Sequence, residues 1–318
     1  MAVTTDLDAT TQNVYVPLIV DNFAKGVPLV VALIGKARFL DGGQNIRQPV
    51  ALASSGLATE YSGGDTLDVS YVNDFAACEL GWAQYGTTIS ITGKDDLINS
   101  GKAAILSVIS SKLQKYEVEL RELLSDDIIQ SDGTNAKKVV GLTAAIDDST
   151  NVTTYGGLSR ATYTNWKSKY SANGAAGRAV TLSLLGTQTG NATKGNTKPN
   201  LYLTSQAVIN KLITLYQPNQ RFIDDSKYAS AGFQAVGYQN RPVIQDESVN
   251  QISSLDRMFI LNTNYLDLYF HKARFFRYVP FQRSPNQDAA TAMILVACQL
   301  LCSAPRLNCQ IRDLDATL

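Results

Sequence analysis

DDLINSGKAAILSVISSKLQKYEVELRELLSDDIIQS, residues 95–131, is the stretch that decides the fold. Its apolar residues recur at spacings of three or four, which is the pattern of one long amphipathic helix. The predicted apolar stripe consists of Ile105, Ile109, Leu113, Tyr116, Leu120 and Leu123. Lys115 and Glu119 are a favourable pair four residues apart, and Asp132–Gly133 is expected to end the helix. At about 1.5 Å per residue the helix would be about 55 Å long, which exceeds a usual globular helix.

A polar, glycine-punctuated excursion precedes this helix. The sequence predicts two strands there, Ile46–Leu52 and Leu67–Val72, the second because apolar and polar residues alternate along it. Between them lies Ala53–Asp65, a tip of small and polar residues. A two-stranded hairpin alone is marginally stable in water, so it needs a surface to lie on. In an assembly of copies, a neighbouring subunit can supply that surface.

The rest of the chain mixes strands and helices, so the predicted fold class is α+β. Val139–Asp267 is expected to form a separate mixed unit, with helices at Ser159–Tyr170 and Gln206–Tyr216 and a loop at Leu185–Lys198. The tail Asn308–Leu318 is polar. The predicted strands are Trp82–Ile91, Pro199–Leu203, two strands around a turn within Phe233–Gln245, Arg257–Leu261, Tyr269–Val279 and Ala290–Leu301.

The composition favours a protein that associates with other chains. Of its 318 residues 45% are hydrophobic, enough for a sizeable core, and 18% are charged. The charged fraction is below the roughly 25% typical of soluble domains, which surface hidden in contacts between chains would explain. Basic and acidic residues number 28 each, so the formal net charge is zero. A dedicated nucleic-acid binder would more often be basic, and near-neutral charge favours association.

The cysteines and the apolar runs favour a soluble protein from a reducing compartment. There are four cysteines without any CxxC pair, and Cys298 and Cys302 lie in an apolar run, where small buried thiols are expected. The polar opening, which contains Asp6, does not resemble a signal peptide. The apolar runs Val27–Ile34 and Ala292–Leu301 are far shorter than the roughly 20 residues that span a bilayer. No membrane partner is expected.

The residues of common catalytic sites are missing. His271 is the only histidine, so a Ser–His–Asp or Cys–His site would have to use it, and it lies in a predicted strand. Gly190–Gly195 begins like a phosphate loop, but Asn196–Thr197 follows where the motif requires lysine and then serine or threonine. No catalytic residue, cofactor or metal site is therefore expected.

Two further patterns leave alternatives open. Paired carboxylates, Glu117 or Asp126 with Asp224, would be the acids of a hydrolase or carbohydrate-active domain, although solvated helix or loop charges explain them better. Basic residues interleaved with aromatic ones in Lys272–Arg283 could contact nucleic acid. An amphipathic strand with one polar face explains the second pattern better, because the chain as a whole is neutral.

The order of the parts resembles the major capsid protein of tailed bacteriophages, which has the Hong Kong 97-like fold. That order is a terminal arm, a long hairpin, a strand, a long helix, a mixed α/β insertion and returning strands. The residues that carry the likeness are Gly93–Gly133 for the spine helix, Asn200–Asn210 for an axial strand and helix, Gly237–Asp246 for an axial hairpin, and Ala290–Asn308 for a closing peripheral strand. The likeness covers most of the chain, and its specificity lies in the order of the parts.

The resemblance implies a domain plan and a function. It places an N-terminal arm at 1–37, an extended loop at 38–80, a peripheral domain with the spine helix at 81–136 and 268–318, and an axial domain at 137–267. It implies a structural protein, not an enzyme. Copies would assemble into hexamers and pentamers that form an icosahedral head around double-stranded DNA, contacted non-specifically. Its location would be the virion capsid, assembled in the host cytoplasm.

The resemblance also bears on partners. A separate scaffolding protein and a portal are implied, because the residues before Gly93 are already used by the arm and the loop. No lysine lies between Lys36 and Lys94, so the lysine crosslink of some family members is not expected. The alternative within the same class is another self-assembling phage part, such as a tail or sheath protein.

Contacts between subunits are expected at the extended loop and the axial domain. Exposed charge pairs are worth only about 0–1 kcal/mol each, so apolar burial at about 25 cal/mol per Å² should supply most of the assembly energy. The predicted subunit-interface residues are Arg38, Arg47, Glu60, Tyr61, Asp65, Arg221, Asp224 and Asp225.

Overall fold

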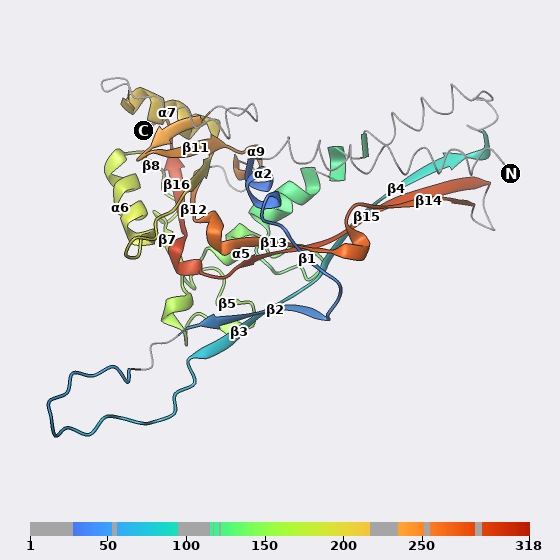
Figure 1. The fold of residues 1–318 in the computed structure, drawn as a ribbon. Helices are drawn as coiled ribbons and strands as arrows, with labels where there is room; N and C mark the ends of the chain where they lie inside the picture. The colour runs from blue at the N-terminus through green and yellow to red at the C-terminus, as the bar shows by residue number, and fades with distance from the viewer. Residues whose placement is uncertain are drawn as a thin grey trace.

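A computed structural model describes residues 28–52, 56–94, 115–216 apart from 117 and 121, 235–250, 255–283 and 288–318. Within these ranges the fold is α+β, as the sequence predicts, and two sheets form its framework. Figure 1 shows the long strands β4, β14 and β15 reaching toward one end of the molecule, with helices α6 and α7 at the other end.

The first sheet has five strands and is centred on β15. The strand order is β1-β13-β15-β14, and β4 also pairs with β15. The pairing of β15 with β4 is antiparallel and runs from Ala289↔Thr92 to Cys298↔Ala83. Residues 296–302 of β15 are all buried, as expected for a central strand. The strands are β1 (Arg38–Leu40), β4 (Ala83–Thr92), β13 (Leu266–His271), β14 (Arg277–Arg283) and β15 (Ala289–Cys302).

The second sheet has seven strands, in the order β10-β11-β9-β12-β16-β7, and β8 pairs with β16. Helices α6 (Leu182–Ala192) and α7 (Gln206–Tyr216) share an apolar core with this sheet. Val208, Ile209 and Leu212 of α7 are fully buried in that core. The strands are β7 (Lys169–Ser171), β8 (Arg178–Ala179), β9 (Leu201–Thr204), β10 (Ala235–Tyr238), β11 (Arg241–Gln245), β12 (Asp256–Leu261) and β16 (Cys309–Asp315).

Two small sheets and several short helices complete the described part of the chain. The small sheets pair β2 (Asn45–Ala51) with β3 (Phe75–Gly81), and β5 (Thr154–Tyr155) with β6 (Leu158–Ser159). The short α-helices are α2 (Pro28–Ile34), α5 (Leu142–Ala145) and α9 (Glu247–Asn250). The 3-10 helices are η1 (Thr164–Trp166), η3 (Thr263–Tyr265), η4 (Lys272–Arg274) and η5 (Pro305–Leu307).

The C-terminal part of the long helix is present where the structure describes it. Residues 115–116, 118–120 and 122–130 are helical, while 95–114 lie outside the described residues. Lys115 and Glu119 form the predicted pair, with 3.9 Å between Nζ and Oε1. The helix ends before Gly133, whose φ of +78° suits glycine. The predicted stripe is wrong at Leu123, which is 48% exposed, because the buried line runs through Leu120, Leu124 and Ile128.

Most of the other predicted elements are confirmed. Five of the strands and the helix Gln206–Tyr216 begin and end within two residues of their predicted bounds. The hairpin predicted within Phe233–Gln245 is β10 and β11, and its turn residues Gln239 and Asn240 have φ of 50° and 62°. Positive φ at both central residues is the geometry that tight hairpins favour.

The predicted loop at Leu185–Lys198 is wrong over most of its length, because α6 spans Leu182–Ala192. The side chain of Thr181 caps this helix by accepting a hydrogen bond from the backbone N–H of Leu184. Leu185, Thr189 and Ala192 face the core at helical spacing. Tertiary burial thus outweighs the low helix propensity of the two glycines in the segment.

The predicted helix Ser159–Tyr170 is also wrong. The chain there forms β6, the short η1 and β7. The cause is Arg160, which is fully buried and donates hydrogen bonds of 2.7–2.8 Å to the carbonyl oxygens of Val152, Ala144 and Ala145. A buried guanidinium needs these acceptors, and the turns of this segment bring them together.

The predicted strand Tyr269–Val279 is interrupted by η4. Its two halves are β13 and β14, and Phe276 between them has a φ of 44°. The interruption lets the rings of Phe275 and Phe276 pack on Phe270, with centroids 4.9 and 6.4 Å away.

The polar tail contains a buried strand. β16 lies between β12 and β7 in the second sheet, with Cys309, Ile311 and Leu314 buried. The end of the chain therefore lies among strands of the second sheet, whereas β13, β14 and β15 belong to the first.

Candidate assembly interface

A two-stranded ribbon, β2 and β3, leaves the first sheet and carries the segment 56–74 at its end (Figure 1). The strands pair antiparallel from Asn45↔Gly81 to Ala51↔Phe75. One face of the ribbon is buried through Ile46, Val50 and Cys78. On the other face, Arg47 Nε lies 2.8 Å from Glu79 Oε1. The ribbon therefore has one side fixed to the body and one side open.

Hydrogen bonds fasten the ribbon to the rest of the molecule. The backbone N–H of Glu79 donates to the carbonyl oxygen of Gly156 at 2.9 Å. The hydroxyl of Tyr269 donates to Gln48 Oε1 at 3.0 Å. The amide of Asn165 donates to the carbonyl oxygen of Leu52 at 3.0 Å, near the point where the ribbon ends. These bonds hold the ribbon in one orientation.

Cys78 shows how tightly the ribbon is packed. Its side chain is fully buried, and a Cβ added at Gly156 would collide with the Cys78 Sγ atom. Gly156 has a φ of +58°, a conformation that favours glycine. Burial, and then the charge of Glu79, raises the pKa of the Cys78 thiol to about 12, so it stays a neutral packing group.

The segment 56–74 projects beyond the ribbon, and it contains no strand. The predicted strand Leu67–Val72 is wrong, because β2 pairs with Phe75–Gly81 instead. Residues 58–73 are all exposed. Among the described residues, the hydrogen bonds of 56–73 stay within the segment, such as Ser62 N–H to Asp65 Oδ2 at 2.9 Å. Hydrogen bonds from Ser70 hold the pKa of Asp68 below its usual value.

The same segment exposes a cluster of large apolar side chains. Soluble proteins seldom leave such clusters uncovered, and exposed apolar patches mark interaction sites. Figure 1 shows the segment leaving the body beside β2 and β3 and extending away from both sheets. The exposed fractions are 69% for Tyr61, 54% for Leu67, 94% for Val69 and 93% for Tyr71, and Phe75 at the start of β3 is 71% exposed. The alternation of Leu67, Val69 and Tyr71 is visible in the sequence, where it predicted a half-exposed strand.

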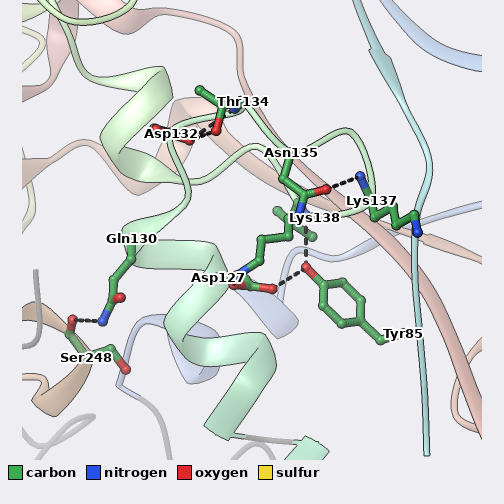
Figure 2. Close-up of polar contacts among 10 residues, drawn as sticks. Tyr85, Asp127, Gln130, Asp132, Thr134, Asn135, Lys137, Lys138 and Ser248 are labelled. Carbon is green, nitrogen blue, oxygen red and sulfur yellow. Dashed lines mark hydrogen bonds and ion pairs between the residues drawn. The ribbon is translucent and has the colours of Figure 1, made fainter.

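A buried polar junction fixes the end of the long helix to the first sheet (Figure 2). The hydroxyl of Tyr85 on β4 donates to Asp127 Oδ2 at 3.0 Å and accepts from the N–H of Val139 at 2.9 Å. Lys138 Nζ lies 2.7 Å from Asp127 Oδ1. Burial raises the pKa of the Tyr85 phenol, so it remains a neutral donor. The helix and the sheet thus form a stiff frame for the ribbon.

The same helix also contacts α9, which lies beside the second sheet. The side-chain amide of Gln130 donates to the carbonyl oxygen of Ser248 at 2.9 Å, as Figure 2 shows. The hydroxyls of Ser125 and Ser248 lie 3.0 Å apart. Ser248 belongs to α9, which packs against β12 and β9 of the second sheet.

The predicted interface residues fall into three groups. Glu60, Tyr61 and Asp65 lie on the projecting segment, where all are exposed. Arg47 lies on the open face of the ribbon, and Arg38 lies 3.3 Å from Asp267, where burial raises the pKa of the carboxyl and the arginine opposes that rise. Arg221, Asp224 and Asp225 lie outside the described residues. Contacts of these residues with other subunits stay a prediction.

Of the carboxylates in the hydrolase alternative, the structure describes only Asp126. His271 Nδ1 accepts a hydrogen bond from the N–H of Ala273 at 3.1 Å, and its ring packs on Trp82. Asp126 is half-buried on the helix, while Glu117 and Asp224 lie outside the described residues. The described residues contain no group of three or more His, Cys, Asp or Glu side chains that could hold a metal ion.

The cysteines, the basic and aromatic stretch and the helices can also be compared with the sequence-based predictions. All four cysteines are buried and free, which confirms the prediction for Cys298 and Cys302. In the basic and aromatic stretch, Lys272 pairs with Asp41 at 2.6 Å, and Arg274 donates to Gln84 at 2.7 Å. No helix in the described ranges is both long and apolar enough to cross a membrane.

Comparison with solved structures identifies the fold. A capsid protein in the asymmetric unit of cyanophage A-1(L) matches with a TM-score of 0.68 and 16% identity, over 91% of this chain and 93% of that one. The holo-SrpI encapsulin complex from Synechococcus elongatus PCC 7942 matches with a TM-score of 0.59 and 10% identity, over 90% and 88%. The capsid of a native GTA particle matches with a TM-score of 0.59 and 10% identity, over 89% and 90%.

These likenesses confirm the predicted capsid fold of the Hong Kong 97 type over nearly the whole chain. Comparisons of the sequence itself give no match, either to a family model or to a curated protein.

Proposed function

We propose that this chain is the major shell protein of a tailed bacteriophage. Copies assemble into hexamers and pentamers and close into an icosahedral head that encloses double-stranded DNA. The DNA is contacted through its backbone without sequence reading. A separate scaffolding protein and a portal take part in assembly, which occurs in the host cytoplasm.

The observation that carries this proposal is the combination of a firmly held ribbon with an exposed apolar segment at its end. The ribbon is hydrogen-bonded to the body at Glu79 and Gln48, whereas Val69 and Tyr71 are more than 90% exposed. A side chain held in that position loses its contact with water only against another molecule. The capsid fold, which serves as a shell in the structures it matches, makes that molecule a second copy.

The two sheets support a division into parts. We propose that the first sheet and the long helix form the peripheral domain, and that the ribbon with segment 56–74 forms the extended loop. The second sheet with α6 and α7 forms the axial domain, and β16 extends that domain beyond the predicted boundary at residue 267. Charge pairs across the axial contacts involve Arg221, Asp224 and Asp225.

Particle formation tests the proposal directly. The purified chain, alone and with a phage scaffolding protein, is examined by negative-stain electron microscopy and sedimentation. Closed shells are the expected result. Monomers under both conditions would contradict the proposal, and open tubes would favour a tail or sheath protein. The encapsulin complex shares the fold, so the ratio of absorbance at 260 and 280 nm of particles from infected cells decides whether they contain nucleic acid.

Deleting residues 54–64 tests the role of the projecting segment. Assembly should weaken, because the apolar side chains no longer reach a neighbour. Thermal unfolding of the monomer should be unchanged, because Tyr61 and the rest of 58–64 are exposed. Unchanged assembly would refute the role given to this segment.

A further inference from the structure

A cavity of about 380 Å³ lies beside the end of the ribbon, where segment 56–74 begins. We refer to it as the basic pocket. Asn165, whose amide binds the carbonyl oxygen of Leu52 at the end of the ribbon, is part of its wall. The pocket draws on η1, β7 and η5, which belong to different parts of the sequence. Its polar lining includes Lys167, Ser168, Lys169, Arg306, Asn165 and Asp148.

The charges around the basic pocket are unbalanced. Lys167, Lys169 and Arg306 are each half-buried. Within the described ranges, neither lysine has an ion-pair partner, and Arg306 binds only a neutral amide oxygen, that of Asn165, at 2.9 Å. The carboxylate of Asp148 is already engaged, because its Oδ1 accepts from the N–H and the hydroxyl of Thr150. Three cations and one carboxylate leave a net positive charge in the lining, which favours a bound anion.

The three cations define the ligand class. Each can donate charge-assisted hydrogen bonds, which carboxylate and phosphate oxygens accept. The pocket therefore suits a carboxylate or a phosphate.

Segment 56–74 carries the complementary charges. Its charged residues are Glu60, Asp65, Asp68 and Asp74, all acidic, and it contains no lysine, arginine or histidine. Among them, Glu60, Asp65 and Asp68 are exposed. Among the described residues, these acidic side chains form no hydrogen bond or ion pair with the residues that line the pocket of their own copy, and the segment extends away from both sheets (Figure 1). It can fill the pocket of another copy.

We propose that the basic pocket of one copy binds a carboxylate from segment 56–74 of a second copy, with Lys167, Lys169 and Arg306 as counter-charges. This inference rests on the proposed function and names the receptor of the projecting segment. Each copy carries one segment and one pocket, so the contact is head-to-tail. Contacts of that kind close into rings, as hexamers and pentamers require.

The dimensions of the pocket favour a side chain over packaged DNA. A duplex presents a broad surface with a charge about every 1.7 Å along its axis. It is best matched by a wide basic face, whereas the cations here line a concave site of about 380 Å³. A single carboxylate on an extended chain can enter such a site.

A charge-exchange experiment tests the proposal. Variant one is Lys167→Glu with Lys169→Glu, and variant two is Glu60→Lys with Asp65→Lys and Asp68→Lys. Each alone should raise the protein concentration needed for assembly at least about tenfold, as expected for like charges at a contact. The chain with all five changes should regain most of the loss, because opposite charges face each other again. Light scattering and sedimentation measure assembly, and thermal unfolding monitors the monomer.

The matched control is Lys194→Glu with Lys198→Glu, which makes the same charge change at two exposed lysines near the end of α6. It should assemble like the unmodified protein. Variant two alters only exposed residues, so it reports on assembly even if variant one fails to fold. Normal assembly of variant two, or an equal loss of assembly in the control, would contradict the proposed contact between the pocket and the segment. The proposed shell function would remain. The same holds if variant one forms normal shells that contain less DNA, which would assign the pocket to phosphates. If the unmodified chain forms no shells, the proposed function itself fails.

Discussion

Replacing Val69 and Tyr71 by serine should weaken the shell and leave the monomer untouched. The two side chains are 94% and 93% exposed, on the segment that the ribbon holds away from both sheets. Exposed substitutions of this kind usually change the free energy of unfolding by less than about 0.5 kcal/mol. Any larger effect must therefore come from a surface that covers these side chains in the assembly.

The size of the effect follows from apolar burial. Full burial of a large apolar side chain is worth about 1.5–3 kcal/mol, so the two together would contribute about 3–6 kcal/mol. If a neighbour covers about half of their surface, the loss is about 1.5–3 kcal/mol for each subunit contact. Since about 1.4 kcal/mol is a tenfold change in affinity, the concentration needed for assembly should rise roughly ten- to hundredfold.

The assay compares assembly and folding in the same samples. Light scattering over a series of protein concentrations gives the onset of assembly, and circular dichroism gives the melting temperature of the monomer. A matched control places the same loss inside the molecule: Val296→Ser on β15, where the side chain is 1% exposed, should lower the melting temperature. The reasoning is refuted if the double serine variant assembles at the normal concentration, or if it melts earlier than the unmodified monomer.

Three further predictions concern stability. Gly156→Ala should lower the free energy of unfolding by about 1–3 kcal/mol more than Gly157→Ala in urea titrations, because both glycines have positive φ but only the first would push a Cβ into Cys78; equal effects would contradict the packing. Asp127→Asn should lower it by about 1–3 kcal/mol, since the buried lysine–carboxylate contact is lost, and a fully stable variant would count against the junction. Burial raises the pKa of Asp246 from 3.8 to about 6, so the folded state binds the proton more tightly and stability rises as the pH falls from about 7 to about 5. Asp246→Asn should abolish that rise and, at about pH 7.5, stabilise the monomer by about 1–3 kcal/mol, as chemical unfolding at several pH values would report.

Hydrophobic periodicity correctly predicted the elements whose conformation depends mainly on neighbouring residues. The described residues from 115 to 130 are helical as the spacing predicted, and the predicted strand Ala290–Leu301 lies within β15. The turn at Gln239–Asn240 lies between two apolar runs and was predictable from local chemistry. In these segments the local pattern and the tertiary environment agree, so either alone gives the same answer.

Periodicity failed where distant residues set the conformation. Arg160 draws its segment into turns because its acceptors come from residues 144–152, which no window around Ser159 reveals. The alternation at Leu67–Val72 is present but forms no strand, since the partner of β2 is Phe75–Gly81. A strand needs hydrogen-bonding partners as well as a pattern, and the pattern does not name them.

By itself the sequence determined the α+β class, the order of the main elements and the presence of a glycine-punctuated excursion before the long helix. Only the tertiary structure decided that hydrogen bonds fix the ribbon to the body while the side chains of segment 56–74 are exposed. It also decided that Lys167, Lys169 and Arg306 line one cavity. The physical reason is the sequence separation of the residues that interact. Helix and strand periods act over a few neighbouring residues, whereas a cavity joins side chains that lie more than a hundred positions apart and meet only after the sheets have packed.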